Sequence, residues 1–202
     1  MNDPGDTASA PNPFSTRYVR PGAAPYLFPA GLSAEKLVDR LRRSGWRGQI
    51  IGPHGSGKSA LLAALVPAIE AAGRQVCLIE LHDGQRRLPA GFPPPDNAPQ
   101  PTVVIVDGYE QLSRWSRFRL RRTCDRLGLG LLATAHRPIR LPDLFRTQPE
   151  PALAQRIVGQ LLEQDRSLVT PEDVAERFSA HEGDLREMLF DLYDVYERRR
   201  RR

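Results

Sequence analysis

The stretch QIIGPHGSGKSALLAAL, from Gln49 to Leu65, determines the fold expected for this chain of 202 residues. It begins with a short apolar run, continues through closely spaced glycines and ends in leucines at helical spacing. A strand, a glycine-rich turn and a helix in this order are typical of a βαβ unit. The stretch also holds Lys58, one of only two lysines beside 27 arginines, which indicates a chemical need for lysine at this position.

Residues 52–59, GPHGSGKS, fit the pattern G-x-x-x-x-G-K-[ST] of a phosphate-binding loop. Its glycines let the backbone wrap a polyphosphate closely, and the helix that follows adds free N–H groups and a positive dipole end. Lys58 is expected to reach the β- and γ-phosphates, where arginine's broad fork does not fit. The alternative is a chance match of a glycine-rich turn. The expected nucleotide-binding residues are Gly52, Pro53, His54, Gly55, Ser56, Gly57, Lys58, Ser59 and Ala60.

A second candidate for chemistry is the run TVVIVD at residues 102–107. Its apolar residues place Asp107 at the carboxyl end of a buried strand, where an acidic group holds Mg²⁺, often through water. A turn-forming Asp-Gly pair is the alternative. Because the glycine-rich loop precedes this strand, the metal interpretation is favoured. The expected metal ligands are the Ser59 hydroxyl and Asp107.

Short apolar runs alternate with helical patterns in the middle of the chain, which is typical of a parallel α/β fold. From Pro149 onward the pattern is helical alone. Strands are expected at 48–51, 75–80, 102–107, 130–135 and 141–147, and helices from the cap at Ser33 to Gly45 and from Lys58 to Ala72. The expected domains are a tail (1–13), an α/β core (14–148), a helical lid (149–197) and a basic tail (198–202).

Composition excludes several classes of protein. No apolar stretch is as long as a membrane span, and the N-terminus lacks the pattern of a signal peptide, so we expect a cytoplasmic protein. Cys77 and Cys124 lie in an expected strand and helix, where cysteines usually act as small core residues. The net charge of +5 comes from arginines spread over the whole chain, which favours a compositional bias over a dedicated nucleic-acid surface.

Together, the loop, the strand that ends in Asp107 and the later helices resemble the P-loop NTPases of the additional-strand division. The helical end makes the chain similar to AAA+-like ATPases, particularly their small bacterial and replication-initiator-like branch, over about residues 45–197. The resemblance implies a three-layer sandwich around a parallel sheet of order 5-1-4-3-2, with a small helical lid. It also implies ATP and Mg²⁺ as ligands of Walker A and Walker B motifs, and a nucleotide-driven ATPase switch.

The same resemblance implies a catalytic base and a sensor. In the family a glutamate directly follows the metal-binding aspartate, but here Gly108 stands there and Glu110 is the nearest acid. Glu110 is therefore the candidate base, with capping of the next helix as its alternative role. Thr134, at the end of the fourth strand, matches the sensor, and His136 follows two residues later. The alternative for Thr134 is a hydroxyl that satisfies a backbone group.

A second sensor and an arginine finger complete the family pattern. Arg186, in GDLRE, matches the second sensor, but Asp184 and Glu187 also fit a helix cap with Arg186 facing water. Between Ala135 and Leu141 there is too little chain for the helix that carries an arginine finger in ring-forming members. We therefore do not expect a ring, and both a monomer and a nucleotide-dependent dimer stay open.

Residues 113–122, SRWSRFRLRR, are expected to form a helix with Leu112, Trp115 and Phe118 inward and the arginines 114, 117 and 121 outward. Such a face either binds nucleic acid or an acidic partner, or is simply solvated. The guanine-reading N-K-x-D and the L-S-G-G-Q of ABC ATPases are absent, which favours ATP. The expected function is an ATP-dependent switch. Its alternative is a weakly hydrolysing adaptor that recruits a partner through this helix.

Overall fold

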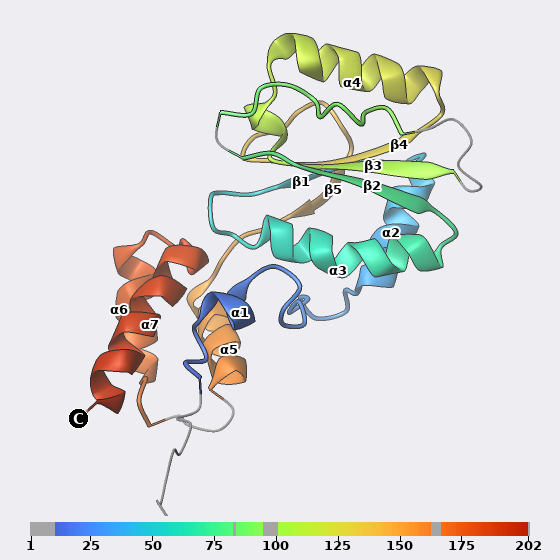
Figure 1. The fold of residues 1–202 in the computed structure, drawn as a ribbon. Helices are drawn as coiled ribbons and strands as arrows, with labels where there is room; N and C mark the ends of the chain where they lie inside the picture. The colour runs from blue at the N-terminus through green and yellow to red at the C-terminus, as the bar shows by residue number, and fades with distance from the viewer. Residues whose placement is uncertain (1–10, 83, 95–100, 163–166, 202) are drawn as a thin grey trace, which may run out of the picture. The chain divides into compact units, whose positions relative to one another are not determined.

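The computed structural model describes residues 11–82, 84–94, 101–162 and 167–201. These residues divide into two compact units. The first, here the α/β unit, spans Pro25–Pro149, and the second, here the helical unit, joins residues 11–24 to residues 150–201 (Figure 1). The first ten residues of the expected N-terminal tail lie outside the described part.

The α/β unit is built on a five-stranded sheet in which every pairing is parallel. Its strands are β1 (Arg47–Ile51), β2 (Gln75–Glu80), β3 (Thr102–Asp107), β4 (Gly130–Ala135) and β5 (Asp143–Arg146). They lie in the order β2-β3-β4-β1-β5, which is 5-1-4-3-2 read from the other edge. The predicted parallel α/β fold and strand order are confirmed.

Helices cover both faces of this sheet (Figure 1). Helices α2 (Ala34–Arg43) and α3 (Lys58–Ala71) lie on one face, and α4 (Arg114–Arg126) lies on the other. A short 3-10 helix, η1 (Tyr109–Gln111), follows β3. The predicted cap of α2 is present, because the hydroxyl of Ser33 accepts a hydrogen bond from the backbone N–H of Lys36.

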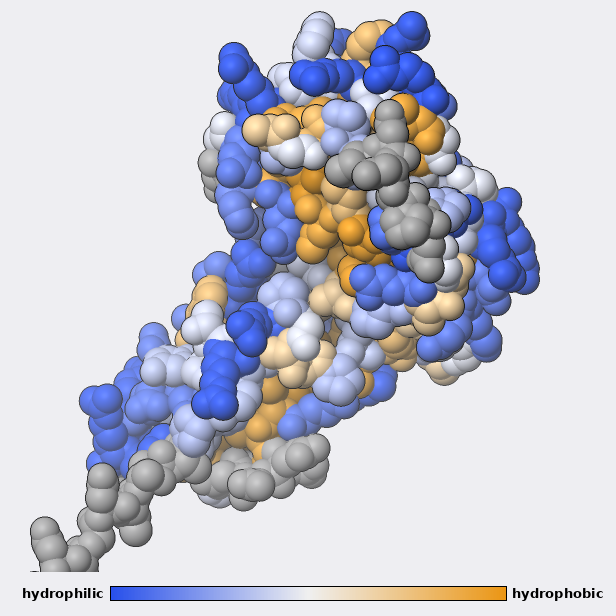
Figure 2. All heavy atoms as spheres, turned by 45° about the vertical axis from the view of Figure 1, so that its right-hand side comes forward, coloured by the Kyte–Doolittle hydropathy of each residue, from blue (hydrophilic) through white to orange (hydrophobic). Residues whose placement is uncertain are grey.

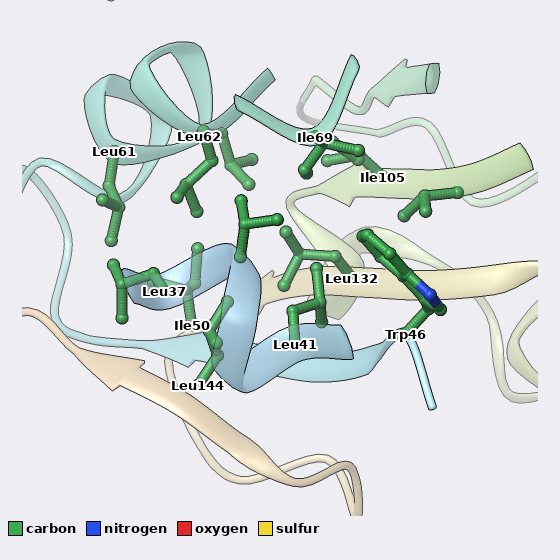
Figure 3. Close-up of a cluster of buried hydrophobic side chains, with 13 residues drawn as sticks. Leu37, Leu41, Trp46, Ile50, Leu61, Leu62, Ile69, Ile105, Leu132 and Leu144 are labelled. Atoms are coloured by element: carbon green, nitrogen blue, oxygen red, sulfur yellow. The ribbon is translucent and has the colours of Figure 1, made fainter. Parts of the chain in front are cut away.

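Side chains of a strand point alternately to the two faces of the sheet, so the central strands contribute to a separate hydrophobic core on each face. Val103 and Ile105 of β3 pack with α2 and α3, whereas Val104 and Val106 pack on the α4 side. Figure 3 shows how the first core is filled, with leucines of α2 and α3 meeting Ile50 of β1. Because the central strands β3 and β4 are buried on both faces, their runs are largely apolar rather than alternating with polar residues.

The helical unit consists of α1 (Thr16–Val19), α5 (Pro151–Leu161), α6 (Pro171–Ala180) and α7 (Leu185–Arg200). The prediction had placed residues 14–24 in the α/β core, and the structure places them here instead. Phe14 is fully buried in this core, with its ring centroid 6.1 Å from that of Tyr196. The Asn12 side chain donates hydrogen bonds to the carbonyl of Tyr193 and the carboxylate of Glu197. Burial of one aromatic ring therefore decides where the segment belongs.

The expected basic tail also differs, because Arg198–Arg200 form the last turn of α7. Arg199 donates to both carboxylate oxygens of Asp173, at 2.5 and 2.9 Å, and to the carbonyl of Leu168. Asp173 also completes the capping box of α6 with Thr170. These bonds hold the pKa of the Asp173 carboxyl below its usual range, with the Arg199 hydrogen bonds as the main cause.

Asp173→Ala is therefore expected to destabilise the α6–α7 pair by about 1–3 kcal/mol. Because the folded pKa is lowered, this contribution is present above the unfolded pKa of about 4 and disappears as the pH falls through the folded value. Hydrogen exchange of α6 and α7 in the full chain, near neutral pH and in acid, measures both effects. Asp194→Ala, which removes an exposed carboxylate from α7, is the control and should change little. Equal protection in the two variants contradicts the prediction.

Helix α4 is rotated relative to its prediction. Leu112 is buried as expected, but Trp115 and Phe118, predicted to point inward, are 68% and 63% exposed. Arg117 and Arg121, predicted to point outward, instead place their guanidinium groups 5.3 and 5.7 Å from the centroid of the buried Tyr109 ring. The physical reason is that planar guanidinium groups stack on an aromatic face. Because Tyr109 belongs to η1 and not to α4, the periodicity of α4 alone could not predict this contact.

The surface of the α/β unit is mixed. On the face drawn in Figure 2, hydrophobic residues reach the surface among hydrophilic ones. The large exposed hydrophobic side chains of this unit are Leu78, Trp115 and Phe118. Both cysteines are free thiols, and burial raises the pKa of Cys124 to about 11. None of the described helices combines the length and apolar character required to cross a membrane.

Candidate functional site

The glycine loop (residues 52–59) connects the carboxyl end of β1 to the start of α3. Gly55 and Gly57 have φ of +60° and +87°, and Gly57 is the N-cap of α3. Residues with a Cβ rarely adopt this left-handed conformation, so the two glycines turn the chain back on itself at the helix N-terminus. Ser59 and Ala60 follow in the first turn of α3, and both are partly exposed. The backbone N–H groups at such a helix start are suited to an anion.

The base of the loop is anchored on the residue after β5. A Cβ on Gly52 would lie 1.9 Å from the hydroxyl of Thr147 and 2.7 Å from that of Ser56, so only glycine fits. The Ser56 and Thr147 hydroxyl oxygens are 2.6 Å apart, and Ser56 also donates to the carbonyl of Pro53. The backbone N–H of Thr147 donates to the carbonyl of Ile51. Sequence reasoning missed Thr147, because nothing near it in the chain points to the loop.

The ammonium of Lys58 lies across the start of the glycine loop. Its Nζ donates to the carbonyls of Gly52 at 2.8 Å and Pro53 at 2.6 Å, and the residue stays partly exposed. A positive charge is thereby held beside the N–H groups of the α3 start. The combination of cation and helix terminus makes this loop a suitable position for a polyphosphate.

Asp107 and Thr134 meet at the carboxyl ends of β3 and β4. The Thr134 hydroxyl donates to Asp107 Oδ1 at 2.5 Å and accepts from the backbone N–H of Gly108 at 2.9 Å. Thr134 is completely buried, so these two bonds are made without competition from water. The hydroxyl therefore satisfies the backbone N–H of Gly108, which is the alternative role considered for Thr134. At the same time it orients the carboxylate of Asp107, the predicted metal ligand.

Gly108 explains why no glutamate directly follows Asp107. Its φ is +80°, and a Cβ there would lie 3.0 Å from the carbonyl oxygen of Leu81. The chain therefore turns sharply at this position, and the next acid, Glu110, is carried on η1. This turn accounts for the glycine at the position where the resemblance implies a glutamate.

Glu110 is linked to the glycine loop through two histidines. Its Oε1 lies 3.2 Å from Nε2 of His136, which follows β4. The His136 ring is edge-on to that of His54 in the loop, with centroids 6.1 Å apart. The other carboxylate oxygen, Oε2, is buried and has no hydrogen-bond partner among the described residues. The acid, the end of β4 and the loop thus meet at one end of the sheet, a grouping that the residue pattern did not predict.

The oxygen donors of Ser59 and Asp107 are suited to a magnesium ion that also binds the phosphates of a ligand. The described residues contain no group of three or more His, Cys, Asp or Glu side chains that could hold a metal alone. Magnesium usually takes only one or two protein ligands and completes its shell with water and substrate phosphates. Ser59, in the first turn of α3, and Asp107, at the carboxyl end of β3, each supply one oxygen ligand of the kind that such a site uses.

The remaining candidate, Arg186, lies exposed in the first turn of α7, in the helical unit. Asp184 caps this helix, accepting hydrogen bonds from the backbone N–H groups of Arg186 and Glu187. The capping interpretation is therefore confirmed for Asp184, and the sensor role of Arg186 stays a prediction.

Neither a scan against models of known protein families nor a search of curated proteins found a match to this chain. The assignment of a function therefore depends on the geometry described above and on the chemistry of its residues.

Proposed function

We propose that this protein binds ATP with Mg²⁺ in the glycine loop and hydrolyses it, as an AAA+-like P-loop ATPase that acts as a nucleotide-driven switch. The observation that carries the proposal is the position of the Lys58 ammonium across the glycine loop, whose tight turns need glycine at positions 52, 55 and 57, at the start of α3. Asp107 ends β3, and Glu110 follows it on η1 at the same end of the sheet. Anion, metal and water sites are all needed for phosphoryl transfer to water.

Each residue has a role in this proposal. The backbone N–H groups of the glycine loop bind the β- and γ-phosphates, and Lys58 neutralises their charge. Ser59 and Asp107 hold Mg²⁺, and Thr134 keeps the Asp107 carboxylate in its orientation. When bound, the metal neutralises charge that develops on the transferred phosphoryl group.

Glu110 is proposed as the general base. His136 fixes one of its carboxylate oxygens, and the other is buried without a partner, which supports a role in accepting a hydrogen bond from a water molecule. The helical unit is proposed as the lid, in which Arg186 senses the nucleotide. Absence of a guanine-reading motif favours ATP over GTP.

Isothermal titration calorimetry of the full chain with ATP and with GTP, each with and without Mg²⁺, tests the proposal. We expect a Mg²⁺-dependent heat with ATP that is larger than with GTP. If neither triphosphate gives a heat in the presence of Mg²⁺, the proposed function is wrong.

Glu110→Gln separates hydrolysis from binding. If Glu110 is the base, turnover should fall by about 10²-fold or more while ATP affinity is retained, because the amide keeps the shape but accepts no proton. Steady-state phosphate release and calorimetry measure the two quantities. Glu80→Gln is the matched control, since Glu80 is the exposed residue opposite Asp107 on β2. Unchanged turnover in Glu110→Gln would leave Glu110 with a structural role only, and negligible turnover in both proteins would favour the weakly hydrolysing adaptor.

A further inference from the structure

The outer side of α4 carries two large aromatic rings that no other part of the described chain covers. Trp115 and Phe118 are three residues apart, on one side of the helix, and are 68% and 63% exposed. The Arg119 guanidinium lies 5.9 Å from the centre of the Trp115 ring. Large aromatic side chains normally contribute to a core, so an exposed pair flanked by arginine indicates a surface for recognition.

A hollow of about 540 Å³ opens beside these rings. Arg87, Pro89 and Phe92 line one side of it, and Trp115 and Arg119 line the other. The two sides are tied together, because the Arg86 carbonyl accepts hydrogen bonds from the backbone N–H of Ser113 and the hydroxyl of Ser116. The hollow is therefore built into the fold and has a volume typical of small-ligand sites.

The charge of this surface is strongly positive. Helix α4 holds six arginines and one acid, Asp125, which pairs with Arg47 at 2.6 Å. Two of the six bind inward, since Arg117 donates to the carbonyl of Glu110 and Arg121 to the Tyr109 hydroxyl. None of the described residues lining the hollow is acidic. The other four arginines of α4 are exposed, and so are two arginines of the neighbouring segment 86–92. These six are Arg86, Arg87, Arg114, Arg119, Arg122 and Arg126.

From these observations we infer that α4 and the segment 86–92 bind single-stranded nucleic acid. Bases stack on Trp115 and Phe118, and phosphates pair with Arg87, Arg119 and Arg122. Interleaved aromatic and guanidinium groups match this polymer, because each of its units presents both a planar base and an anion. In a duplex the bases are already stacked on one another and leave the two rings unused. An acidic peptide satisfies the arginines but has no plane for Trp115. This inference is independent of ATP binding.

Tryptophan fluorescence of the full chain tests the stacking directly. The chain has two tryptophans, and Trp46 is buried, with Arg74 over its ring at 4.5 Å. Oligothymidylate should therefore quench only the Trp115 emission, and this quenching should weaken as salt is raised. Trp115→Phe should keep most of the affinity, measured by anisotropy of a labelled oligothymidylate, but lose the quenching.

Variants identify the surface. Trp115→Ala and Phe118→Ala should each weaken binding by about tenfold, and Arg119→Ala should also reduce the salt dependence. These side chains are exposed, so the fold is retained, which circular dichroism checks. Arg43→Ala removes an exposed arginine from α2, on the opposite face of the sheet, and should have a much smaller effect.

Four results would overturn the inference. They are no binding of oligothymidylate at low salt, equal binding by Trp115→Ala and the unchanged protein, equal affinity for a duplex of the same length, and displacement of the oligonucleotide by polyglutamate at the same charge concentration. The last result would assign the surface to an acidic protein partner. A failure to bind ATP has no bearing on any of these outcomes.

Discussion

Lys58→Ala is expected to weaken ATP binding by at least about 10²-fold and to abolish measurable turnover. The ammonium lies over the glycine loop through hydrogen bonds to the carbonyls of Gly52 and Pro53, so its charge is already in position for a phosphate. An alanine leaves the anion with backbone N–H groups alone. Calorimetry with ATP and Mg²⁺, together with phosphate release, measures both losses.

The chain provides its own control for this experiment. Lys36, the other lysine, donates to the carbonyl of Gly31 at 2.7 Å and lies exposed on α2. Lys36→Ala should leave nucleotide binding unchanged. Lys58→Arg should also bind poorly, because the wide, planar guanidinium does not fit the space of a compact ammonium. If Lys58→Ala binds ATP as the unchanged protein does, the glycine loop is not a phosphate site.

Gly52→Ala is expected to have the largest effect on stability, a loss of more than about 3 kcal/mol or failure to fold. The new Cβ would lie 1.9 Å from the Thr147 hydroxyl and 2.7 Å from both the Thr147 carbonyl oxygen and the Ser56 hydroxyl. Rotation of a side chain relieves part of this overlap, but the backbone carbonyl cannot move without breaking the pairing of Thr147 with Ile51. Urea unfolding of the full chain measures the loss.

A second substitution separates the contributions to this strain. Thr147→Ala removes the nearest atom, so Gly52→Ala with Thr147→Ala should recover part, but not all, of the lost stability. Gly91→Ala is the control, because nothing lies within 4 Å of the Cβ that it adds. If Gly52→Ala is as stable as Gly91→Ala, the close approach at the base of the loop does not exist.

Several structural features were predictable because they depend on residues close together in the chain. The spacing of glycines and leucines in residues 49–65 predicted the β1–loop–α3 unit, and Ser33 predicted the start of α2. The order of the strands follows from the resemblance, whose elements occur in the same sequence here. The choice of Thr134 also came from the resemblance, and the structure places its hydroxyl against Asp107 because parallel strands end at the same edge.

The site beyond these residues depends on contacts between distant parts of the chain. Thr147 closes the glycine loop from a position 91 residues after Ser56, and no local pattern marks it. The buried ring of Tyr109 turns Arg117 and Arg121 inward, so the amphipathic pattern of α4 predicted the wrong face. A prediction from helical periodicity assigns charged residues to the exposed face of the helix. It therefore fails for an arginine that points inward and stacks on a buried ring.

Local features of the chain specify the alternation of strands and helices, the glycine loop with its single lysine, and the acid at the end of β3. Those features depend on backbone propensity and on the period of apolar residues, which act over a few positions. Packing between distant parts of the chain, by contrast, joins residues 11–24 to the helical unit, sets Glu110 against His136 and turns Trp115 outward. Each of these depends on which side chains fill the remaining space once the elements pack, a property that no short stretch of sequence contains.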